Sequence, residues 1–480
     1  MKQILVSRDH LETRVALLED GRLAEMYLER PHRQSLVGNV YKGRVENVLP
    51  GMDAAFVDIG LDRNGFLSVA EVVAQEAGRG RGRKIGDLLK PGKELWVQVT
   101  RDPMGGKGPR LTMEVGIPGR YVVYFPAGGG SGVSRRLDDA ERERLRAVSR
   151  EVKPETGGVI VRTAAEGAGK EAVERDLRFL QRVWAGAERR GQEVSAPALV
   201  YAEAELALRS VRDLLSPEFS SVLVDDEKLH RRLTNYLKAV APDLKDRIQR
   251  YDGDTPLFGH FGLEHEMEKA LARRVSLPSG GYIVIDHTEA MTVIDVNTGR
   301  YVGKRQLEDT TLKTNLEACK EVVRQLRVRD IGGIIVIDFI DMSAKTNREV
   351  VLAALEAEFT VDRTKTYVVE ISPLGLVEMT RQNVTQGLRE IVTATCPVCR
   401  GQGRVISEES ALIVVERRLA DVLRASALPV VRVEVHPRLL GQLAPGGAVI
   451  QRLQAQTGRR AEVQEAAGDV PLAHVAVVPD

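Results

Sequence analysis

Two apolar runs in the second half of the chain each lead into an aspartate. The first run covers residues 282–285 and 291–294 and ends at Asp295. The second covers residues 334–337 and ends at Asp338. Short, continuous runs rich in β-branched residues are typical of strands that are buried on both faces of a sheet. We therefore expect buried strands here that deliver two carboxylates to one edge of a sheet.

The N-terminal quarter of the chain predicts two all-β segments. Residues 4–7 and 13–29 alternate apolar and polar positions, and the Asp20-Gly21 pair within them is typical of a hairpin turn. Between residues 38 and 111, short apolar runs follow one another with glycine and proline between them. That spacing predicts a small barrel.

Later segments combine strands with helices. Residues 112–207 mix strands with a charged helix over 170–190, and residues 277–392 alternate strand and helix as in an α/β layer fold. A helix predicted at 311–329 has one apolar face by its 3.6-residue period. That face consists of Leu312, Leu316, Cys319, Val323 and Leu326. The tail predicts a helix at 410–426 and then short strands.

Composition limits the class of protein. A chain of 480 residues is too long for one core, so several domains are expected. The 69 basic and 68 acidic residues nearly cancel, so net charge gives no argument for nucleic-acid binding. No apolar run approaches the roughly 18 residues of a membrane helix. The N-terminus lacks a signal-peptide pattern, and three cysteines exclude a disulfide framework. We expect a cytoplasmic protein without a transmembrane segment.

The two strand-end acids are candidates for a metal site. A carboxylate is costly to place beside a buried strand unless something pairs with it. The C-terminal edge of such strands is where α/β sheets bind ligands. With Asn297 and Asp341, the acids Asp295 and Asp338 would form an oxygen-rich site suited to Mg²⁺ or Mn²⁺. The alternative is that each acid caps the turn or helix that follows it.

The predicted barrel is the best candidate for contact with a nucleic-acid strand. OB-type barrels stack bases on exposed aromatic rings within a basic groove. The rings available are Tyr41, Phe56 and Phe66. The basic residues available are Arg44, Arg101, Lys107 and those of the arginine–glycine tract at 78–84, which is expected to be a mobile loop. The alternative is that the phenylalanines are core residues of the barrel.

Cys396 and Cys399 form a CxxC motif in a glycine-rich segment. Two thiolates at this spacing can chelate zinc, but a structural zinc needs four ligands. The third cysteine, Cys319, falls on the apolar helix face and is expected to be a packing residue. A zinc shared between the motifs of two copies would complete the site, which predicts a homodimer. A redox CxxC is the alternative, and it fits less well because the motif does not open a helix.

Arg162 and Thr163 follow a predicted strand and precede a glycine-containing loop. An arginine fork, a hydroxyl and loop amides together make a plausible monophosphate pocket. A surface arginine at a strand end is the alternative. The EGAGK string downstream lacks the Walker spacing, which argues against nucleotide hydrolysis.

Long strings of this sequence resemble the ribonuclease E/G family. The match extends over nearly the whole chain, and the strings are long and specific. They are NVYKGRVENVLPGMDAAFVDIG, RTAAEG, LPSGGYIVIDHTEAMTVIDVNTG, RQLRVRDIGGIIVIDFIDM, LGLVEMTRQ and CPVCRGQG. Because no long disordered tail is present before residue 480, we expect the chain to be like the shorter members of the family.

The resemblance implies a multidomain α/β and α+β architecture. Its parts would be an RNase H-like fold at 1–34 and 208–270, an S1-type OB RNA-binding domain at 35–111, a 5′-sensor region at 112–207, a DNase I-like catalytic domain at 271–392, a zinc link at 393–405 and a small dimerisation domain at 406–480. The OB domain and the sensor region would be insertions in the RNase H-like fold. The pattern of the residues alone does not name the RNase H-like and DNase I-like folds.

The resemblance also implies roles for individual residues. Asp295 and Asp338 match ligands of one Mg²⁺ per active site, and Asn297 matches a polar partner near the scissile phosphate. Cys396 and Cys399 match the thiolates of a shared Zn²⁺. The residues that match a 5′-monophosphate pocket are Arg162, Thr163, Gly119 and Val123. Those that match RNA contacts are Phe56, Phe66 and Lys107, beside the basic residue Arg101.

Two positions depart from the family's pattern. Lys365 stands at an RNA-contacting position where longer members of the family have arginine. Asn383 stands where a basic residue is usual, which removes one expected phosphate contact, and the arginine–glycine tract could offset it.

The function implied is Mg²⁺-dependent endonucleolytic cleavage of single-stranded RNA. A preference for 5′-monophosphorylated substrates and products with 5′-phosphate and 3′-hydroxyl ends are expected, with a role in ribosomal RNA maturation and messenger RNA turnover. The alternatives are a non-catalytic RNA-binding scaffold protein with a zinc-linked dimer, and a DNA nuclease. Dimer against tetramer, one metal against two, the natural RNA targets and the role of the arginine–glycine tract stay open.

Overall fold

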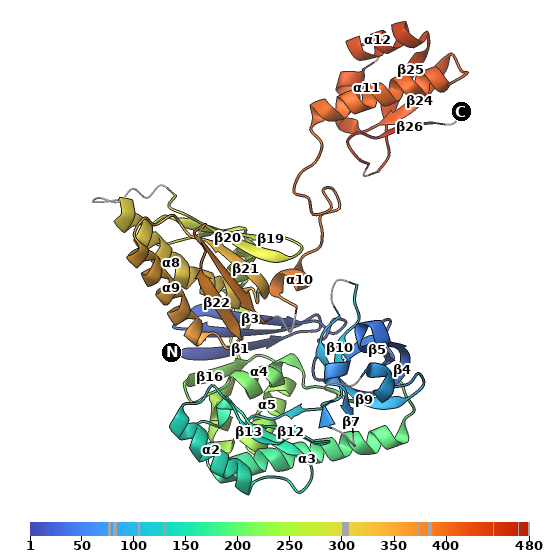
Figure 1. The fold of residues 1–480 in the computed structure, drawn as a ribbon. Helices are drawn as coiled ribbons and strands as arrows, with labels where there is room; N and C mark the ends of the chain where they lie inside the picture. The colour runs from blue at the N-terminus through green and yellow to red at the C-terminus, as the bar shows by residue number, and fades with distance from the viewer. Residues whose placement is uncertain are drawn as a thin grey trace. The chain divides into compact units, whose positions relative to one another are not determined.

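The computed structural model describes residues 1–480 apart from 75–77, 80–83, 104–105, 129, 300–306, 373, 383–385, 445, 469 and 479–480. The described chain divides into two compact units, Met1–Val392 and Thr393–Asp480 (Figure 1).

The first unit begins with a five-stranded mixed sheet of order β17-β16-β1-β2-β3. Its strands are β1 (Lys2–Arg8), β2 (Thr13–Glu19), β3 (Arg22–Glu29), β16 (Phe219–Val224) and β17 (Ile248–Arg250). The predicted hairpin turn is confirmed, since Asp20 and Gly21 have φ angles of 49° and 76°. Parallel pairing of β16 with β1 returns the chain to its N-terminal strands after a long excursion.

Helices cover both faces of this sheet. Ile4 and Val6 pack into a core with α4 (Leu206–Leu214) and α5 (Glu227–Val240). Leu5, between them, points to the opposite face and packs in a second core. The second core contains residues of α6 (Leu257–His260), α7 (Leu263–Leu271) and α10 (Leu388–Val392), together with Val328 at the end of α8 (Leu307–Val328). Successive buried residues in one strand follow from covering both faces.

The predicted barrel is confirmed. Its strands follow the order β4-β5-β6-β10-β9, and β9 pairs back with β4 to close it. They are β4 (Val40–Leu49), β5 (Ala54–Asp58), β6 (Gly65–Ser68), β9 (Glu94–Arg101) and β10 (Arg110–Thr112), with β15 (Ala198–Tyr201) added beside β4 and α1 (Ile85–Leu88) packed on the barrel. Within the arginine–glycine tract, Gly78–Arg79 form β8, which pairs with β7 (Val73–Ala74). Residues 80–83 of that tract lie outside the described part, so the expected mobile loop stays a prediction.

A four-stranded sheet and two helices form the next layer. The strands are β11 (Ile117–Pro118), β12 (Val122–Phe125), β14 (Gly158–Val161) and β13 (Ser131–Val133), in that spatial order. The helix predicted at 170–190 is confirmed as α3 (Lys170–Glu193). The other helix, α2 (Asp139–Glu151), was not predicted, because Leu145 is its one buried large apolar residue and leaves little periodic pattern.

The strand-end aspartates lie in a six-stranded mixed sheet of order β18-β19-β20-β21-β23-β22. Its strands are β18 (Arg274–Ser276), β19 (Tyr282–His287), β20 (Met291–Asn297), β21 (Gly333–Asp338), β22 (Thr366–Ile371) and β23 (Leu376–Arg381). The helices α8 (Leu307–Val328) and α9 (Lys345–Glu358) share a core with one face of the sheet. The apolar helix face predicted for 311–329 is confirmed in α8.

The expectation that these strands are buried on both faces is wrong. Ile335 and Ile337 of β21 are fully buried against the helices. Ile334, whose side chain points to the other face of the sheet, is 49% exposed, and Tyr367 on the edge strand β22 is 66% exposed. Apolar residues on the open face made the sequence pattern look continuous, although strand geometry sends alternate residues to opposite faces.

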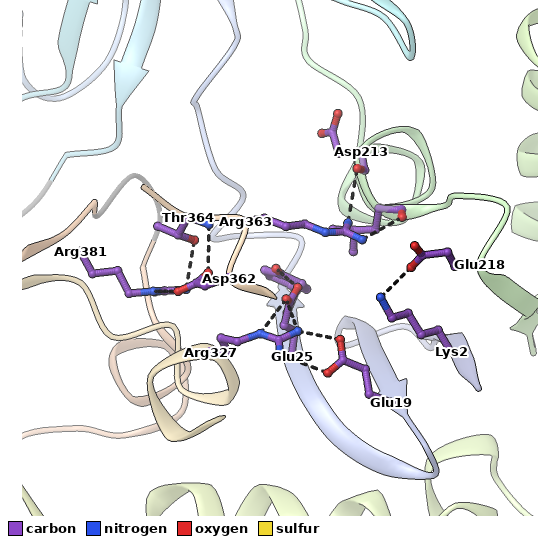
Figure 2. A network of polar contacts seen from close by, with 12 residues as sticks. Lys2, Glu19, Glu25, Asp213, Glu218, Arg327, Asp362, Arg363, Thr364 and Arg381 are labelled. Atoms are coloured by element: carbon purple, nitrogen blue, oxygen red, sulfur yellow. Dashed lines mark hydrogen bonds and ion pairs between the residues drawn. The ribbon is translucent and has the colours of Figure 1, made fainter. Parts of the chain in front are cut away.

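Charged contacts tie the elements of the first unit together (Figure 2). Arg327 of α8 donates from Nη2 to Glu25 at 2.9 Å and to Glu19 at 3.0 Å, both on the first sheet. Arg381, at the end of β23, donates from Nε to Asp362 at 2.8 Å. Both guanidinium groups are buried, and each pairs with two carboxylates that compensate its charge.

The second unit is a small α/β layer. Its sheet has the order β25-β24-β26, from β24 (Val430–Val435), β25 (Arg460–Glu465) and β26 (Val475–Val477). The helix predicted at 410–426 is confirmed as α11 (Glu408–Ala425), where the Ser407 side chain caps the first turn. The tail beyond residue 426 was expected to form short strands, but it also contains the helix α12 (Ala448–Thr457). Its buried residues are Ile450 and Leu453, which leave little periodic pattern in the sequence.

Candidate active site

Asp295 and Asp338 lie directly opposite each other. They are register partners on the parallel strands β20 and β21, and both are exposed on the open face of the sheet. Neighbouring strands are about 4.8 Å apart, so the two carboxylates can approach one small ligand. Asn297, on the same face of β20, donates from Nδ2 to Asp295 Oδ2 at 2.7 Å. The structure thus brings together the three residues that the sequence placed at two separate strand ends.

The electrostatics of this acid pair favour a cation. The pKa of Asp338 is raised, first by partial burial, then by the charges of Asp295 and Asp341. A divalent ion between the carboxylates would offset that repulsion, and oxygen ligands are those that Mg²⁺ prefers. Within the described ranges, no group of three or more histidine, cysteine or acidic side chains forms a closed metal cage. A site with few protein ligands is usual for Mg²⁺, which keeps several waters and binds substrate phosphate.

Asn315 of α8 holds the loop that follows Asp338. It is fully buried, and its Nδ2 donates to the Ile340 carbonyl at 2.8 Å while its Oδ1 accepts from the Ile340 amide at 3.1 Å. Ile340 lies between Asp338 and Asp341, so this pair of hydrogen bonds fixes the segment that carries both acids. Sequence reasoning missed Asn315, although an amide inside an apolar helix pattern marks a buried polar group in need of a partner.

The residues matched to a phosphate pocket also lie together. Arg162 follows β14, and its Nη1 donates to the carbonyl of Gly119, while its backbone amide donates to Tyr121. Val123 is on β12, the strand that pairs with β14, and Thr163 is exposed beside Arg162. One turn and one strand end therefore bring all four predicted residues to the same part of the four-stranded sheet.

Asp176 of α3 binds the main chain of this turn. Its buried Oδ2 accepts from the amides of Tyr121 at 2.7 Å and Val122 at 3.2 Å. A Cβ at residue 119 would lie 2.5 Å from that oxygen, so the position requires glycine. Oδ1 of Asp176 has no hydrogen-bond partner in the described structure, and burial raises the pKa of this carboxyl despite the amides. The sequence analysis did not single out Asp176, whose environment depends on the packing of α3.

The barrel presents an aromatic pair on its outer side. Phe56 and Phe66 are partners across β5 and β6, both half-buried, with ring centroids 6.1 Å apart in an edge-to-face arrangement. The alternative of core phenylalanines is wrong, because the buried residues are their neighbours Ala55, Val57 and Leu67. Arg101 and Lys107 are exposed.

Of the two other residues offered for RNA contact in the barrel, one requires correction. Tyr41 is 5% exposed and belongs to the barrel core, so its ring is not available for stacking. Arg44 is exposed, donates to the Ala196 carbonyl at 2.7 Å and pairs with Glu94 at 3.4 Å, and its contact with RNA stays a prediction. Periodicity could not reveal either environment, since both depend on segments distant in sequence.

Beyond the barrel, Lys365 is exposed where the chain enters β22. Asn383 lies outside the described residues, so the loss of a phosphate contact there stays a prediction.

The CxxC segment forms a tight knuckle in the second unit. Cys396 is exposed and Cys399 is partly exposed, and Arg400, Gly401 and Gly403 adopt left-handed backbone conformations. The pKa of the Cys399 thiol is lowered by the amides of Gly403 and Gly401 and by Cys396, and a thiolate is the form that binds zinc. These donors fit a shared zinc site.

Cys319 is confirmed as a packing residue. It is fully buried in α8, and burial raises the pKa of its thiol to about 12. A search of the described helices for one that is long and apolar enough to cross a membrane finds none.

Comparison with known proteins defines the class to which this fold and site belong. The model of the ribonuclease E/G family matches residues 116–384, and that of the S1 RNA binding domain matches residues 36–114. The chain belongs to the ribonuclease E/G family. The resemblance found in the motif strings and the OB-type barrel are both confirmed.

Individual relatives extend over most of the chain. The chain is 42% identical to ribonuclease G of Escherichia coli strain K12 over 431 residues, which are 88% of each protein. It is 39% identical to ribonuclease G of Haemophilus influenzae, over 88% of this chain and 87% of that protein. It is 38% identical to ribonuclease E of Haemophilus influenzae, over 88% of this chain but 46% of that longer protein.

Proposed function

We propose that this protein is a Mg²⁺-dependent endoribonuclease that cleaves single-stranded RNA and favours 5′-monophosphorylated substrates. The observation that carries the proposal is the register pairing of Asp295 with Asp338 on an exposed sheet face. Family membership and the S1 match support RNA as the substrate. Ribosomal RNA maturation and messenger RNA turnover are the proposed cellular roles.

The acid pair would hold one Mg²⁺ or Mn²⁺ per active site. When bound, the ion would neutralise charge on the scissile phosphate and lower the pKa of a bound water. Asn297 restricts the Asp295 carboxylate through its hydrogen bond to Oδ2, and Asn315 restricts the segment after Asp338. Attack by water with departure of the 3′-oxygen leaves 5′-phosphate and 3′-hydroxyl ends, so the RNA 2′-hydroxyl does not attack.

Other parts of the first unit would hold the RNA. The pocket of Arg162, Thr163, Gly119 and Val123 would bind a terminal 5′-monophosphate through an arginine fork, a hydroxyl and main-chain groups. The edge-to-face Phe56–Phe66 pair would stack on bases. The cations assigned to the RNA backbone are Arg101, Lys107 and Lys365.

We assign the parts of the chain accordingly. The first sheet and its helices would be the RNase H-like domain, residues 112–207 the 5′-sensor region, and residues 271–392 a DNase I-like catalytic domain. Cys396 and Cys399 of two chains would share one Zn²⁺ at the link, and residues 406–480 would complete a homodimer or a tetramer in the cytoplasm.

Asp338→Asn tests the catalytic assignment. Loss of a metal-binding carboxylate should lower kcat by roughly a thousandfold, equivalent to about 4 kcal/mol of transition-state stabilisation. Cleavage of a 5′-monophosphorylated oligoribonucleotide is measured with protein from a host that lacks similar enzymes. Asp286→Asn is a matched control, because Asp286 is on the same sheet and pairs with Arg273 instead.

Undiminished cleavage by the Asp338 variant would sink the nuclease assignment. Binding of RNA without Mg²⁺-dependent cleavage by the wild-type protein would instead favour the scaffold alternative, for which the barrel suffices. Equal cleavage of a 2′-deoxy substrate would favour a DNA nuclease.

A further inference from the structure

Asp213, the penultimate residue of α4, lies between two arginines. Its Oδ2 accepts from Arg212 Nη2 at 2.9 Å, and its Oδ1 forms an ion pair with Arg162 Nη1 at 2.6 Å. Those arginines in turn hold adjacent carbonyls: Arg212 Nη1 donates to Pro118 at 3.1 Å, and Arg162 Nη1 donates to Gly119. Through these two arginines, Asp213 connects α4 to the carbonyls of Pro118 and Gly119, which open the turn of the candidate phosphate pocket (hereafter the phosphate turn).

The contacts of Arg162 use one edge of its guanidinium group. Nη1 binds both Gly119 and Asp213, whereas Nε and Nη2 make no hydrogen bond to any described residue. A planar guanidinium held by one nitrogen presents its other edge in a defined direction, which suits bidentate contact with a phosphate. The side chain is 26% exposed, so that edge is accessible to a ligand.

The charges around Asp213 are balanced. Arg212 also binds Glu203 at 2.7 Å, so Arg162, Arg212, Asp213 and Glu203 carry two positive and two negative charges. Burial alone would raise the pKa of the Asp213 carboxyl, but Arg212 and then Arg162 more than offset the burial, and the pKa is lowered. The carboxylate is therefore charged wherever the enzyme is folded near neutral pH.

The same end of α4 is bound by Arg363, in the segment at 362–365 that leads into β22 of the proposed catalytic domain (hereafter the catalytic segment). Arg363 donates from Nη2 to the Leu214 carbonyl at 3.2 Å and from Nη1 to the Asp213 carbonyl at 3.5 Å (Figure 2). Its neighbour Asp362 is fixed by Arg381 of β23. The opposite end of β23 pairs Leu376 with Asp338. One helix end thus contacts both the phosphate turn at Pro118–Gly119 and the catalytic segment that leads into β22.

We propose that Asp213 is a positioning residue for 5′-end recognition, which orients Arg162 so that its free edge meets a terminal 5′-monophosphate. The proposal rests on the 5′-sensor role proposed above and adds the residue that makes the sensor arginine rigid. Through Arg363, Asp213 also joins the sensor to the catalytic segment, so the orientation of a bound 5′ end is set relative to the acid pair.

The competing possibility is that Asp213 acts as an anion that excludes phosphate from Arg162. The geometry favours positioning, because Asp213 occupies Nη1 together with a main-chain carbonyl and leaves the Nε–Nη2 edge open. Removing its charge would raise the local potential, but at a partly exposed site salt screens that gain. Loss of the ion pair at 2.6 Å would instead release the Arg162 side chain into several rotamers.

Asp213→Asn tests the inference. We measure kcat and KM for one oligoribonucleotide sequence with either a 5′-monophosphate or a 5′-hydroxyl group. The ratio of the two kcat/KM values should fall by about tenfold, mainly through a higher KM for the monophosphorylated RNA. Asp213→Glu keeps the charge and should retain part of the ratio. Glu29→Gln is the matched control, because Glu29, the last residue of β3, pairs with Arg209 of the same helix at 3.0 Å and forms no hydrogen bond or ion pair with Arg162 in the described structure.

Each other result overturns the inference. An equal loss for both substrates, also seen with Asp213→Glu, would assign Asp213 a structural role only. A higher ratio would identify it as a competitor of phosphate. A wild-type enzyme that cleaves both substrates equally would remove the sensor role itself, and a wild-type protein without cleavage would remove the nuclease assignment, so failures at the different levels are distinguishable.

Discussion

At the scale of residues, the site depends on polar groups that packing forces into defined positions. Asp295 and Asp338 are exposed and can bind a ligand. The side chains that hold the main chain near the acid pair and near the Gly119 turn are buried instead. Asn315 and Asp176 are both fully buried, and each binds two main-chain groups of a functional segment. Replacing such a group leaves main-chain atoms without partners, which costs more than the hydrogen bonds themselves contribute.

Asn315→Leu should impair both stability and catalysis. The Ile340 amide and carbonyl would lose their partners, which lowers the free energy of unfolding by about 2 kcal/mol or more. Displacement of the segment after Asp338 should lower kcat by roughly a hundredfold with little change in KM. Thr314→Val is the control, since the Thr314 hydroxyl donates within α8, to the Thr310 carbonyl at 2.9 Å. The kcat values are measured on protein that urea unfolding has shown to be folded. Equal kcat values for the two variants would contradict the positioning role.

Asp176→Asn should change how stability depends on pH. The folded-state pKa of Asp176 is raised above the ordinary 3.8, so the folded protein binds this proton more tightly than the unfolded chain. Its contribution to the free energy of unfolding is therefore lost as pH rises through the folded pKa. Relative to wild type, the asparagine variant should gain stability between about pH 4 and about pH 7. Urea unfolding at the two pH values measures this gain, and a constant difference would refute it.

At the scale of elements, strand pairing brings together residues that are distant in sequence. The parallel register of β20 and β21 sets Asp295 opposite Asp338, and the β5–β6 pair sets Phe56 opposite Phe66. Both pairs face outward while their neighbours fill a core, because side chains alternate along a strand. A shift of one residue in either register would bury these side chains and expose the core residues.

Phe56→Ala should weaken RNA binding without unfolding the barrel. Stacking on an aromatic ring contributes about 1–3 kcal/mol per base, so Kd for a single-stranded oligoribonucleotide should rise about tenfold. Binding is measured in an Asp338→Asn background to prevent cleavage. Met52→Ala, at a residue 63% exposed on the same barrel, is the control and should change Kd little. An unchanged Kd for the Phe56 variant would show that the aromatic pair does not stack on RNA.

At the scale of the whole molecule, the chain consists of a large unit and a small one. The CxxC knuckle lies at the start of the second unit and offers two thiolates. Since structural zinc takes four ligands, the proposed site needs a second chain. Oligomeric state and zinc content should therefore depend on each other.

Cys396→Ser should convert the dimer to monomers and abolish stoichiometric zinc. The wild-type protein should contain one zinc per two chains, measured by metal analysis together with solution mass. Cys319→Ala is the control, because Cys319 lies in the core of the first unit, far in sequence from the knuckle. A serine variant that keeps both its mass and its zinc would exclude the shared site.

Much of the fold followed from local patterns. The Asp20-Gly21 hairpin, the barrel, α3, α8 and α11 were predictable because turn chemistry and periodicity are properties of short segments. The helices α2 and α12 were not, since each buries few residues and depends on its neighbours for stability. The correction at Tyr41 has the same origin, because the burial of a side chain is determined by what packs against it.

By itself, the sequence determined the acids at the strand ends, the thiolates of the knuckle and the family to which the chain belongs, because residue identity and spacing are read without knowledge of packing. Only the tertiary structure decided that the sheet of Asp295 and Asp338 has one open face, and that Asn315 and Asp176 each bind main-chain groups beside candidate site residues. It also decided that Asp213 pairs with Arg162 at the end of α4 that Arg363 binds. These depend on contacts between elements far apart in the chain, where long-range register and burial select one arrangement among many that local propensity allows.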